Sequence, residues 1–228
     1  MIGWLANRLA AMHRRRVFEG IYRRGQWGQA PNGERESGRG SHEPVFVDQY
    51  VAAVNEFLAS HPGVDRLVDL GCGDFNVGRH FTDPAREFLA CDVSGLIIRQ
   101  NRSRYRALPV RFEQRDIAAC SLPAGDVGFL RQVLQHLPND DIASIVRRIN
   151  AARPYRWLIV TEHVPTGECW SPNEDMPAGG STRLRVNSGV ELDAPPFGLA
   201  YRDSQMLCEV HAPDDGRDAA VRTVAYQL

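Results

Sequence analysis

The chain contains no lysine, and all 27 of its basic residues are arginine. Schiff-base chemistry and the phosphate-binding lysine of a Walker-type loop are therefore excluded within this chain. An excess of charge is absent too, because 28 acidic residues leave a formal net charge of −1. No overall field favours binding to nucleic acid or to an anionic membrane.

Cysteines are few, and their spacing matches no metal-binding or disulfide pattern. The five cysteines form no C-x-x-C pair, which argues against a zinc site and favours a reducing compartment. No apolar run is long enough to span a bilayer. The arginines of residues 14–16 follow the apolar N-terminal residues, the reverse of the order in a signal peptide. We therefore expect a cytoplasmic protein without a membrane span.

The length and the composition predict a single domain. A chain of 228 residues with 43% hydrophobic and 24% charged residues can bury a sizeable core. Within residues 1–228, we expect an N-terminal helix and a mobile lid over cofactor and substrate at 1–42. A cofactor-binding core at 43–163 follows, and then a substrate-side insertion with a C-terminal hairpin at 164–228.

The N-terminal segment predicts a helix and a loop. Ile2, Leu5, Leu9 and Met12 recur at helical spacing, which predicts a short amphipathic helix. Its apolar face would pack on the body of the protein or lie on a membrane surface. Residues 25–41 are rich in Gly, Ser, Asn and Arg, and we expect them to form a mobile loop.

Strand-like and helix-like segments then alternate along the chain. Such alternation predicts right-handed β-α-β units and a parallel sheet with helices on both faces. Two strands near the C-terminus, joined by a turn at 214–216, predict a hairpin. The expected fold is α/β: a Rossmann-like, doubly wound, mostly parallel seven-stranded sheet with a C-terminal antiparallel hairpin. We expect helices at 45–60, 94–104 and 140–152, a helix or turn at 77–81, and strands at 66–70, 87–93, 110–116, 127–133, 155–160, 205–210 and 221–226.

The first strand ends at a glycine pair that is typical of a nucleotide site. Gly71 and Gly73 are spaced one residue apart directly after an apolar run. Glycine permits a tight turn and the close approach of a ligand to the backbone, and free N–H groups there favour polar ligands. The dinucleotide pattern G-x-G-x-x-G requires a third glycine, but this position is Asn76. The turn therefore argues mildly against a dinucleotide.

Carboxylates end three predicted strands. Asp69, Asp92 and Asp116 end the first, second and third strands. An acidic residue at the end of the second strand is suited to ribose hydroxyls, and the next carboxylate can accept a hydrogen bond from an adenine amino group. Three carboxylates at one sheet edge suit a ligand with hydroxyls, an amine and a positive charge, and they suit a pyrophosphate poorly.

Four stretches in order carry a family resemblance: 68–73 (VDLGCG), 90–94 (ACDVS), 114–117 (QRDI) and 128–137 (GFLRQVLQHL). The series resembles the motifs of class I S-adenosylmethionine-dependent methyltransferases over residues 64–163. Many members have a third glycine two residues after Gly73, where this chain has Phe75. The G-C-G-D-aromatic form is similar to a bacterial subset that includes sugar and polysaccharide O-methyltransferases, among them a mycobacterial enzyme that acts on methylmannose polysaccharide precursors. Looser matches to this subset lie at 18–41 and 173–197.

The resemblance implies S-adenosyl-L-methionine as cofactor, with S-adenosyl-L-homocysteine as product. It places the methionyl part at Asp69 and the glycine turn, the ribose at Asp92, and adenine between Asp116 and Ile117. Arg131 is expected to border the cofactor, although a salt bridge would also explain it. Asp92 could equally cap a helix that begins near Ser94. The expected cofactor-binding residues are Gly40, Ser41, Asp69, Gly71, Cys72, Gly73, Asp92, Val93, Asp116, Ile117 and Arg131.

Methyl transfer to an alcohol requires alignment of three atoms and removal of a proton. His136 follows the fourth strand, and histidine titrates near neutral pH, so we expect His136 to be the base. Glu162 and His163, after the fifth strand, are the second candidates. A histidine with a structural role at a helix start is the alternative for His136. Glu162, His163 and Asp175 could instead bind Mg²⁺, but a histidine is a poor ligand for that ion, so no metal site is expected.

The remaining candidates concern the acceptor. Tyr22, Trp27 and Trp170 are expected to stack on it, with Asp175 nearby, although core packing would also explain each aromatic residue. The loop at 38–41 is expected to close over the cofactor carboxylate, and a disordered linker is the alternative.

The predicted activity is O-methylation of a small-molecule or oligosaccharide acceptor, most simply a saccharide. A natural-product O- or N-methyltransferase, an RNA methyltransferase and a non-catalytic cofactor-binding protein are the alternatives. The net charge argues against nucleic acid as a partner. The protein is expected to be a monomer or a homodimer.

Overall fold

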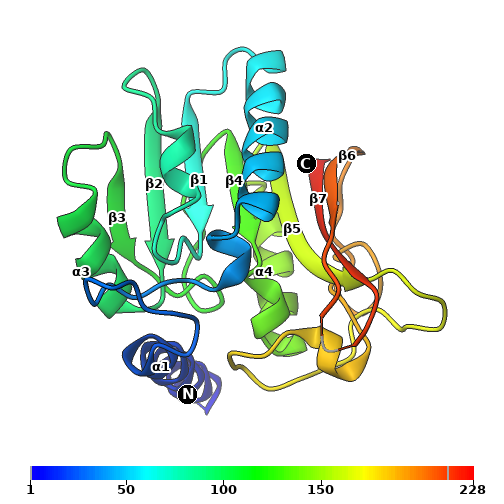
Figure 1. Ribbon diagram of the computed structural model, residues 1–228. Coiled ribbons are helices and arrows are strands. Elements are labelled where there is room, and N and C mark those ends of the chain that lie inside the picture. The colour runs from blue at the N-terminus through cyan, green and yellow to red at the C-terminus, as the bar shows by residue number, and fades with distance from the viewer. Residues whose placement is uncertain (1, 215) are drawn as a thin grey trace.

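The structure, a computed structural model, describes residues 2–214 and 216–228, with side chains from residue 7 onward. A seven-stranded sheet in the order β3-β2-β1-β4-β5-β7-β6 forms its centre (Figure 1). The first five strands are parallel, and β7 pairs antiparallel with both β5 and β6. This arrangement confirms the predicted fold class. The strands are β1 (Arg66–Leu70), β2 (Glu87–Asp92), β3 (Arg111–Gln114), β4 (Val127–Arg131), β5 (Trp157–Pro165), β6 (Asp203–His211) and β7 (Ala219–Gln227).

Helices cover both faces of the sheet, because alternate strand residues point to opposite faces. One face packs on α2 (Pro44–Ser60) and α3 (Gly95–Arg104), and the other packs on α4 (Asn139–Ala152). In β1, for example, Leu67 packs in the core cluster that contains residues of α2 and α3, and Val68 packs in the cluster that contains residues of α4.

Local sequence signals explain where these helices begin and end. Pro44 occupies the first turn of α2, where its missing N–H costs nothing. The Ser94 hydroxyl caps α3 by accepting from the Ile97 N–H at 3.4 Å. Helix α4 has the strongest apolar stripe and ends at Arg153, which adopts a left-handed conformation with φ 43°.

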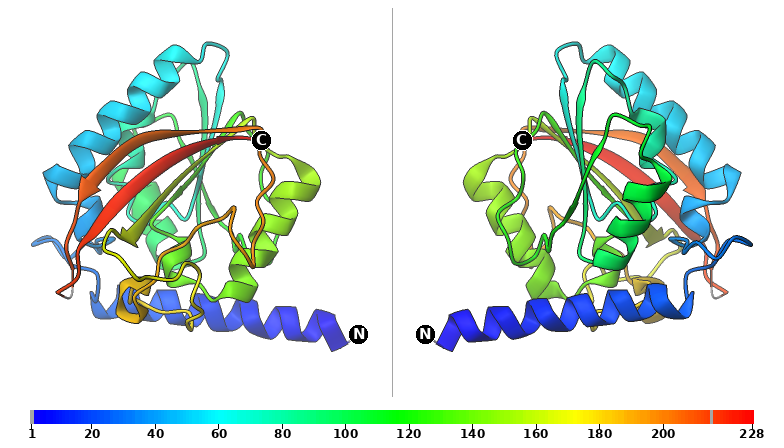
Figure 2. Two further views of the ribbon diagram at one scale, coloured as in Figure 1. Left: turned by 90° about the vertical axis from the view of Figure 1, so that its right-hand side faces the viewer. Right: turned by 90° about the vertical axis from the view of Figure 1, so that its left-hand side faces the viewer.

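The N-terminal helix differs from the expectation. Helix α1 (Ile2–Arg24) is twice as long as the predicted segment and lies across the carboxyl ends of the parallel strands (Figures 1 and 2). Its buried apolar contacts with the body include Phe18, Ile21 and Tyr22. Leu9 and Met12 are 66% and 48% exposed, so the prediction that they pack on the body was wrong. The side chains of Ile2 and Leu5 lie outside the described part of the chain.

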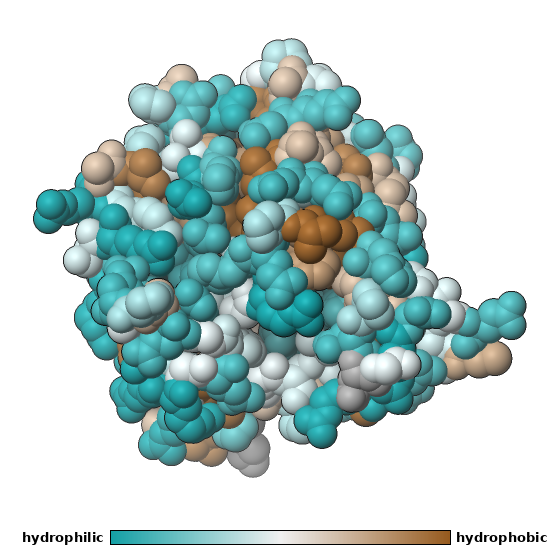
Figure 3. Space-filling model, viewed as in Figure 1, coloured by the Kyte–Doolittle hydropathy of each residue, from teal (hydrophilic) through white to brown (hydrophobic). Residues whose placement is uncertain are grey.

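The last third of the chain packs a long irregular segment, 166–202, beside β5 and then closes the hairpin of β6 and β7. Residues 214 and 217 bridge its turn, and Asp215 lies outside the described residues. Hydrophilic side chains cover most of the face in Figure 3. No helix among the described residues is long and apolar enough to cross a membrane.

Candidate active site

A cavity of about 500 Å³ opens at the carboxyl ends of the parallel strands. One side consists of the ends of β1, β2 and β4 and of the residues directly after β1 and β2, and we call it the strand-end side. The other side, which we call the enclosing wall, comes from α1, residues 37–43, residues 135–137, residues 180–182 and residues 211–214. The crevice beyond the carboxyl ends of parallel strands is where open α/β sheets bind ligands.

The glycine turn after β1 has the geometry that the sequence predicts. Gly71 and Gly73 have φ values of 93° and 52°, a region that disfavours other residues. A Cβ on Gly73 would lie 2.3 Å from the Ser37 hydroxyl oxygen, so any side chain there would displace the enclosing wall. Asp92 fixes the turn, because its carboxylate accepts from the Gly73 N–H at 3.1 Å and from the Ser94 N–H at 2.8 Å. Each oxygen keeps a lone pair for a ligand hydroxyl.

Phe75 replaces the glycine that the resemblance led us to expect, and the structure shows how the chain tolerates it. Its φ is 61°, which is strained for an aromatic residue. The side chain is fully buried and meets Phe88, Tyr105 and Phe112 at ring-centroid distances of 5.4, 5.4 and 5.0 Å. Aromatic packing therefore offsets the backbone strain in this turn.

The strand-end side is acidic, and burial makes its charges costly. Burial, together with the nearby charge of Asp92, raises the pKa of Asp69 to about 7, and the Arg131 charge opposes this shift. Burial also raises the pKa of Asp92 to about 6, against the two N–H groups that it accepts. Both carboxylates have raised pKa values, so their charged forms are disfavoured in the empty cavity. A cationic ligand between them is therefore favoured, because its positive charge stabilises the ionised form of both.

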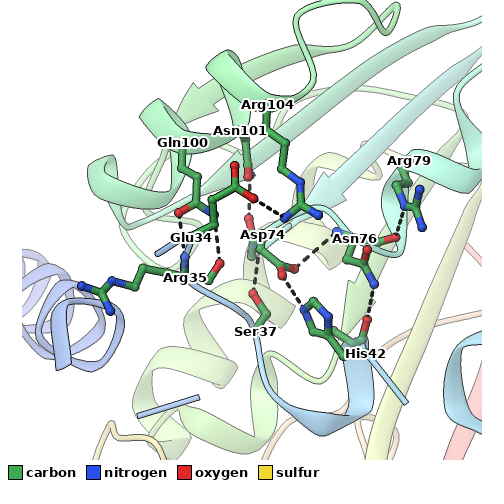
Figure 4. Close-up of polar contacts among 12 residues, drawn as sticks. Glu34, Arg35, Ser37, His42, Asp74, Asn76, Arg79, Gln100, Asn101 and Arg104 are labelled. Carbon is green, nitrogen blue, oxygen red and sulfur yellow. Dashed lines mark hydrogen bonds and ion pairs between the residues drawn. The ribbon is translucent and has the colours of Figure 1, made fainter. Parts of the chain in front are cut away.

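Residues 37–42 are bound to the glycine turn through several polar contacts (Figure 4). The Ser37 hydroxyl accepts from the Asp74 N–H at 2.7 Å, and a His42 ring nitrogen lies 2.6 Å from the Asp74 carboxylate. The Asn76 amide donates to the Ser41 carbonyl at 2.7 Å. The Asp74 carboxylate raises the pKa of His42. This segment therefore forms part of the cavity.

Two further contacts extend this attachment toward α3. The Arg35 N–H donates to the Gln100 side chain at 2.8 Å, and the Gln100 amide donates back to the Arg35 carbonyl at 2.9 Å. Glu34 and Arg104 form an ion pair at 3.2 Å (Figure 4). The expectation of a mobile lid remains a prediction.

Arg131, at the end of β4, supports the enclosing wall from the other side. Its guanidinium donates to the Ser41 hydroxyl at 3.2 Å and to the Gly40 carbonyl, and it lies 4.8 Å from the centre of the Tyr50 ring. Burial lowers its pKa, whereas the Asp69 charge raises it. Arg131 therefore contacts the segment that the sequence placed over the cofactor.

Helix α1 supplies a charged group to the opposite end of the cavity. Arg14 is 5% exposed, and its guanidinium donates to both Asp116 oxygens at 2.9–3.2 Å and to Asp141 at 2.5 Å. Asp116 lies two residues beyond β3 and also accepts from the Ala118 N–H at 3.0 Å. The carboxylate expected to accept from adenine therefore has an internal cationic partner.

His136 is held in one orientation within the cavity. Its Nδ1 lies 3.1 Å from the Ser181 carbonyl and donates to it, which leaves Nε2 as the acceptor. The Gln135 amide lies 3.3 Å from Nε2, and the Trp27 ring lies 4.9 Å from the imidazole centre. Burial lowers the pKa of His136 to about 4, so the ring is neutral at pH 7.

Glu162 and His163 lie within β5, which runs further than expected, and their side chains point to opposite faces. The Glu162 carboxylate accepts from the backbone N–H groups of Leu134 and Gln135 at 3.1 and 2.9 Å, so it holds the turn that carries His136. Burial raises its pKa to about 8. His163 does reach the cavity, and its Nε2 donates to the Ala212 carbonyl at 2.7 Å.

Three predicted residues lie outside the cavity: Glu162, Trp170 and Asp175. Asp175 accepts from the Asn139 N–H at 2.7 Å at the start of α4, a structural role. The described residues include no group of three His, Cys, Asp or Glu side chains that could hold a metal. The predicted residues that line the cavity are Tyr22, Trp27, Gly40, Ser41, Asp69, Gly71, Cys72, Gly73, Asp92, Val93, Asp116, Ile117, Arg131, His136 and His163.

Sequence reasoning missed Arg14, Ser37 and Gln135. Arg14 lies 102 residues from Asp116, and no spacing in the chain marks that pair. Gln135 belongs to the motif that contains His136, and its position beside the proposed base was the available signal.

Residues 67–153 match the family model of the methyltransferase domain. The match confirms a methyltransferase core, and it contains the strand-end carboxylates and His136. No curated protein matches the sequence.

Solved structures share the fold over most of the chain. The N-terminal domain of EvdMO1, solved with S-adenosylhomocysteine bound, is 12% identical with a TM-score of 0.56, covering 92% of this chain and 96% of that domain. The same domain was also crystallised in the presence of D-fucose. A further crystal structure of EvdMO1 is longer, and the chain covers about half of its length, 47%. The N-methyltransferase NodS from Bradyrhizobium japonicum WM9, in complex with S-adenosylhomocysteine, is 13% identical with a TM-score of 0.59, covering 91% of this chain and 99% of NodS.

Proposed function

We propose that the protein is an O-methyltransferase that transfers the methyl group of S-adenosylmethionine to a hydroxyl of a small acceptor, a saccharide. The observation that carries the proposal is the shared cavity, which joins the buried carboxylates Asp69 and Asp92 to the imidazole of His136. A sulfonium cofactor with an ammonium group and ribose hydroxyls complements these carboxylates in charge and in hydrogen bonding.

In this proposal the chain binds the cofactor along the strand-end side. Asp92 accepts from the ribose hydroxyls, the glycine turn lies along the methionyl part, and Asp69 pairs with the ammonium group. Two buried carboxylates with raised pKa values ionise more readily when this cation is bound. S-Adenosylhomocysteine in the structures of EvdMO1 and NodS supports this choice of cofactor.

His136 accepts the proton of the acceptor hydroxyl through Nε2. The Ser181 carbonyl fixes the required tautomer, and the lowered pKa keeps the ring neutral. The acceptor hydroxyl displaces the Gln135 amide from this nitrogen. Trp27 and Tyr22 lie on the same side of the cavity and offer aromatic faces to a sugar ring. Crystallisation of the EvdMO1 domain in the presence of D-fucose supports a sugar as the acceptor class.

An amine acceptor is the second candidate, because the fold of NodS, an N-methyltransferase, covers 91% of the chain. The hydroxyl and amine acceptors can be distinguished by incubating the protein with methyl-labelled S-adenosylmethionine. Each monosaccharide or disaccharide is tested beside its amino-sugar counterpart. We expect label in the neutral sugars, with the methylated oxygen identified by NMR. Label only in the amino sugars, or none although S-adenosylhomocysteine binds, would contradict O-methylation. A salt-dependent gel shift would reveal an RNA acceptor.

A further inference from the structure

The adenine end of the cavity contains an ion pair where the sequence predicted a free acceptor. The single Nε–H of Arg14 is shared between Asp116 Oδ2 at 3.0 Å and Oδ1 at 3.2 Å, and an Nη2–H of Arg14 donates to Oδ2 at 2.9 Å. The Ala118 N–H fills the second position on Oδ1. A carboxylate oxygen accepts about two hydrogen bonds, so protein donors already contact both oxygens of Asp116, with the Arg14 Nε–H shared between them.

The pair is buried and anchored, and breaking it is costly. The side chains of Arg14 and Asp116 are 7% and 13% exposed. The remaining nitrogen of the same guanidinium, Nη1, lies 2.5 Å from the Asp141 carboxylate. Removal of one partner from a buried ion pair leaves an uncompensated charge, so an adenine amino group would have to compete with a guanidinium for Asp116. A neutral amine is the weaker donor in that competition.

Apolar groups surround this end of the cavity instead. Phe18 from α1, Val93 after β2 and residues 117–118 after Asp116 all line it. Phe18 is 8% and Ile117 is 7% exposed, so both present packed surfaces rather than mobile ones. A flat heterocycle gains binding free energy from such surfaces through its faces, irrespective of its exocyclic groups.

We propose that Arg14 is a specificity-determining residue: by occupying Asp116, it makes the site bind the cofactor base by apolar contact, without recognition of the 6-amino group. The inference rests on the proposed cofactor. It also assigns α1 a role in ligand choice, because the residue that neutralises Asp116 belongs to the N-terminal helix and not to the matched methyltransferase domain at 67–153.

The test compares two ligands by isothermal titration calorimetry: S-adenosylhomocysteine, and its purine riboside analogue, in which hydrogen replaces the 6-amino group. Both ligands keep N1 as an acceptor. A free carboxylate that reads the amino group would favour S-adenosylhomocysteine by about 10- to 100-fold. We expect the wild-type protein to bind the two ligands within about threefold. A preference of tenfold or more would overturn the proposal.

Variants separate the role of Arg14 from a structural one. Arg14→Met frees Asp116, and we expect the preference for S-adenosylhomocysteine to rise about tenfold or more. Asp116→Asn should change the affinity for both ligands equally. A loss of affinity in Asp116→Asn that is confined to S-adenosylhomocysteine would contradict the proposal. Arg15→Met is the matched control, because Arg15 is 52% exposed and pairs only with Glu19 in the described contacts. If Arg14→Met fails to fold, the affinities of the wild-type protein and of Asp116→Asn for the two ligands still test the proposal. Absence of S-adenosylhomocysteine binding would instead refute the proposed cofactor.

Discussion

The two sides of the cavity differ in how the chain builds them. The strand-end side consists of short motifs in which neighbouring residues hold one another, as Asp92 holds the Gly73 and Ser94 N–H groups. The enclosing wall joins segments that are far apart in the sequence. Arg14 reaches Asp116 over 102 residues, and His136 reaches the Ser181 carbonyl over 45.

The two sides also differ in electrostatics. Burial raises the pKa values of the strand-end carboxylates Asp69 and Asp92 and so disfavours their charged forms, whereas burial on the other side keeps His136 neutral by lowering its pKa. A cation is therefore favoured at the strand-end side and a neutral hydroxyl near His136. Under the proposed function, cofactor recognition is encoded locally, whereas acceptor recognition depends on the tertiary arrangement.

The largest effect is expected from Asp92→Ala on the strand-end side. The substitution removes the ribose acceptor and leaves two buried N–H groups without partners. We expect the affinity for S-adenosylhomocysteine, measured by calorimetry, to fall by about 100-fold or more. Asp83→Ala is the control, because the Asp83 carboxylate accepts from the nearby Ala85 N–H in an exposed turn, away from the cavity lining. Unchanged affinity in Asp92→Ala would remove the proposed cofactor site.

His136→Asn tests the other side without altering the cofactor contacts. We expect the rate of methyl transfer to fall by about 100-fold at an unchanged affinity for S-adenosylhomocysteine, because the proton acceptor is lost. Single-turnover assays with labelled cofactor measure the rate, and calorimetry measures the affinity. His80→Asn serves as the control, since His80 is not among the residues that line the cavity. A wild-type rate in His136→Asn would exclude this histidine as the base.

The same contrast explains how much could be predicted. The β1 boundaries, the start of α3 near Ser94 and the glycine turn depend on adjacent residues, and the sequence predicts each of them, although the cap of α3 is Ser94 and not Asp92. The extent of β5 was missed because its pairing with β7 continues to Pro165, which placed Glu162 inside the strand and away from the cavity.

Long-range contacts account for the other differences. Helix α1 continues to Arg24, and its last turns pack through Phe18 and Ile21 rather than through the apolar positions at its start. The side-chain partners of Arg14 and Asp175 lie elsewhere in the chain, at Asp116 and Asn139. Their pairing depends on packing that a single sequence does not display, so sequence reasoning gave Asp116 and Asp175 ligand roles.

Phe75→Gly tests whether the glycine turn depends only on local backbone preference. Glycine would relieve the strain of a φ of 61°, a gain of about 1 kcal/mol. It would also remove a fully buried aromatic side chain from the cluster with Phe88 and Phe112, a loss of about 3–5 kcal/mol. We expect the free energy of unfolding to fall by about 2–4 kcal/mol in urea titrations. Unchanged or increased stability would mean that the turn is set by its backbone alone.

The pH dependence of the free energy of unfolding reports on buried titratable groups from both sides of the cavity. In the folded state, the pKa values of Asp69, Asp92 and Glu162 are about 7, about 6 and about 8, all above the values of about 4 in an unfolded chain. At pH values between the unfolded-state pKa and the folded-state pKa of each carboxyl group, the folded state holds a proton that the unfolded state has released. The free energy of unfolding therefore falls as pH rises. His136, with a pKa of about 4, acts in the opposite direction up to about pH 6.5.

Above pH 6.5, the carboxylates determine the trend together with His42, whose pKa is raised by Asp74 and which acts in the same direction. We expect the midpoint of thermal unfolding of the ligand-free protein to decrease by several degrees between pH 6.5 and 8.5 at constant ionic strength. Asp69→Asn should flatten the part of the decrease near pH 7, whereas Asp83→Asn should leave it unchanged, because Asp83 lies in an exposed turn. Saturating S-adenosylmethionine should reduce the decrease, since a bound cation favours the ionised carboxylates. A midpoint that rises over this range would contradict the assignment of the strand-end side as the acidic, cation-binding half of the cavity.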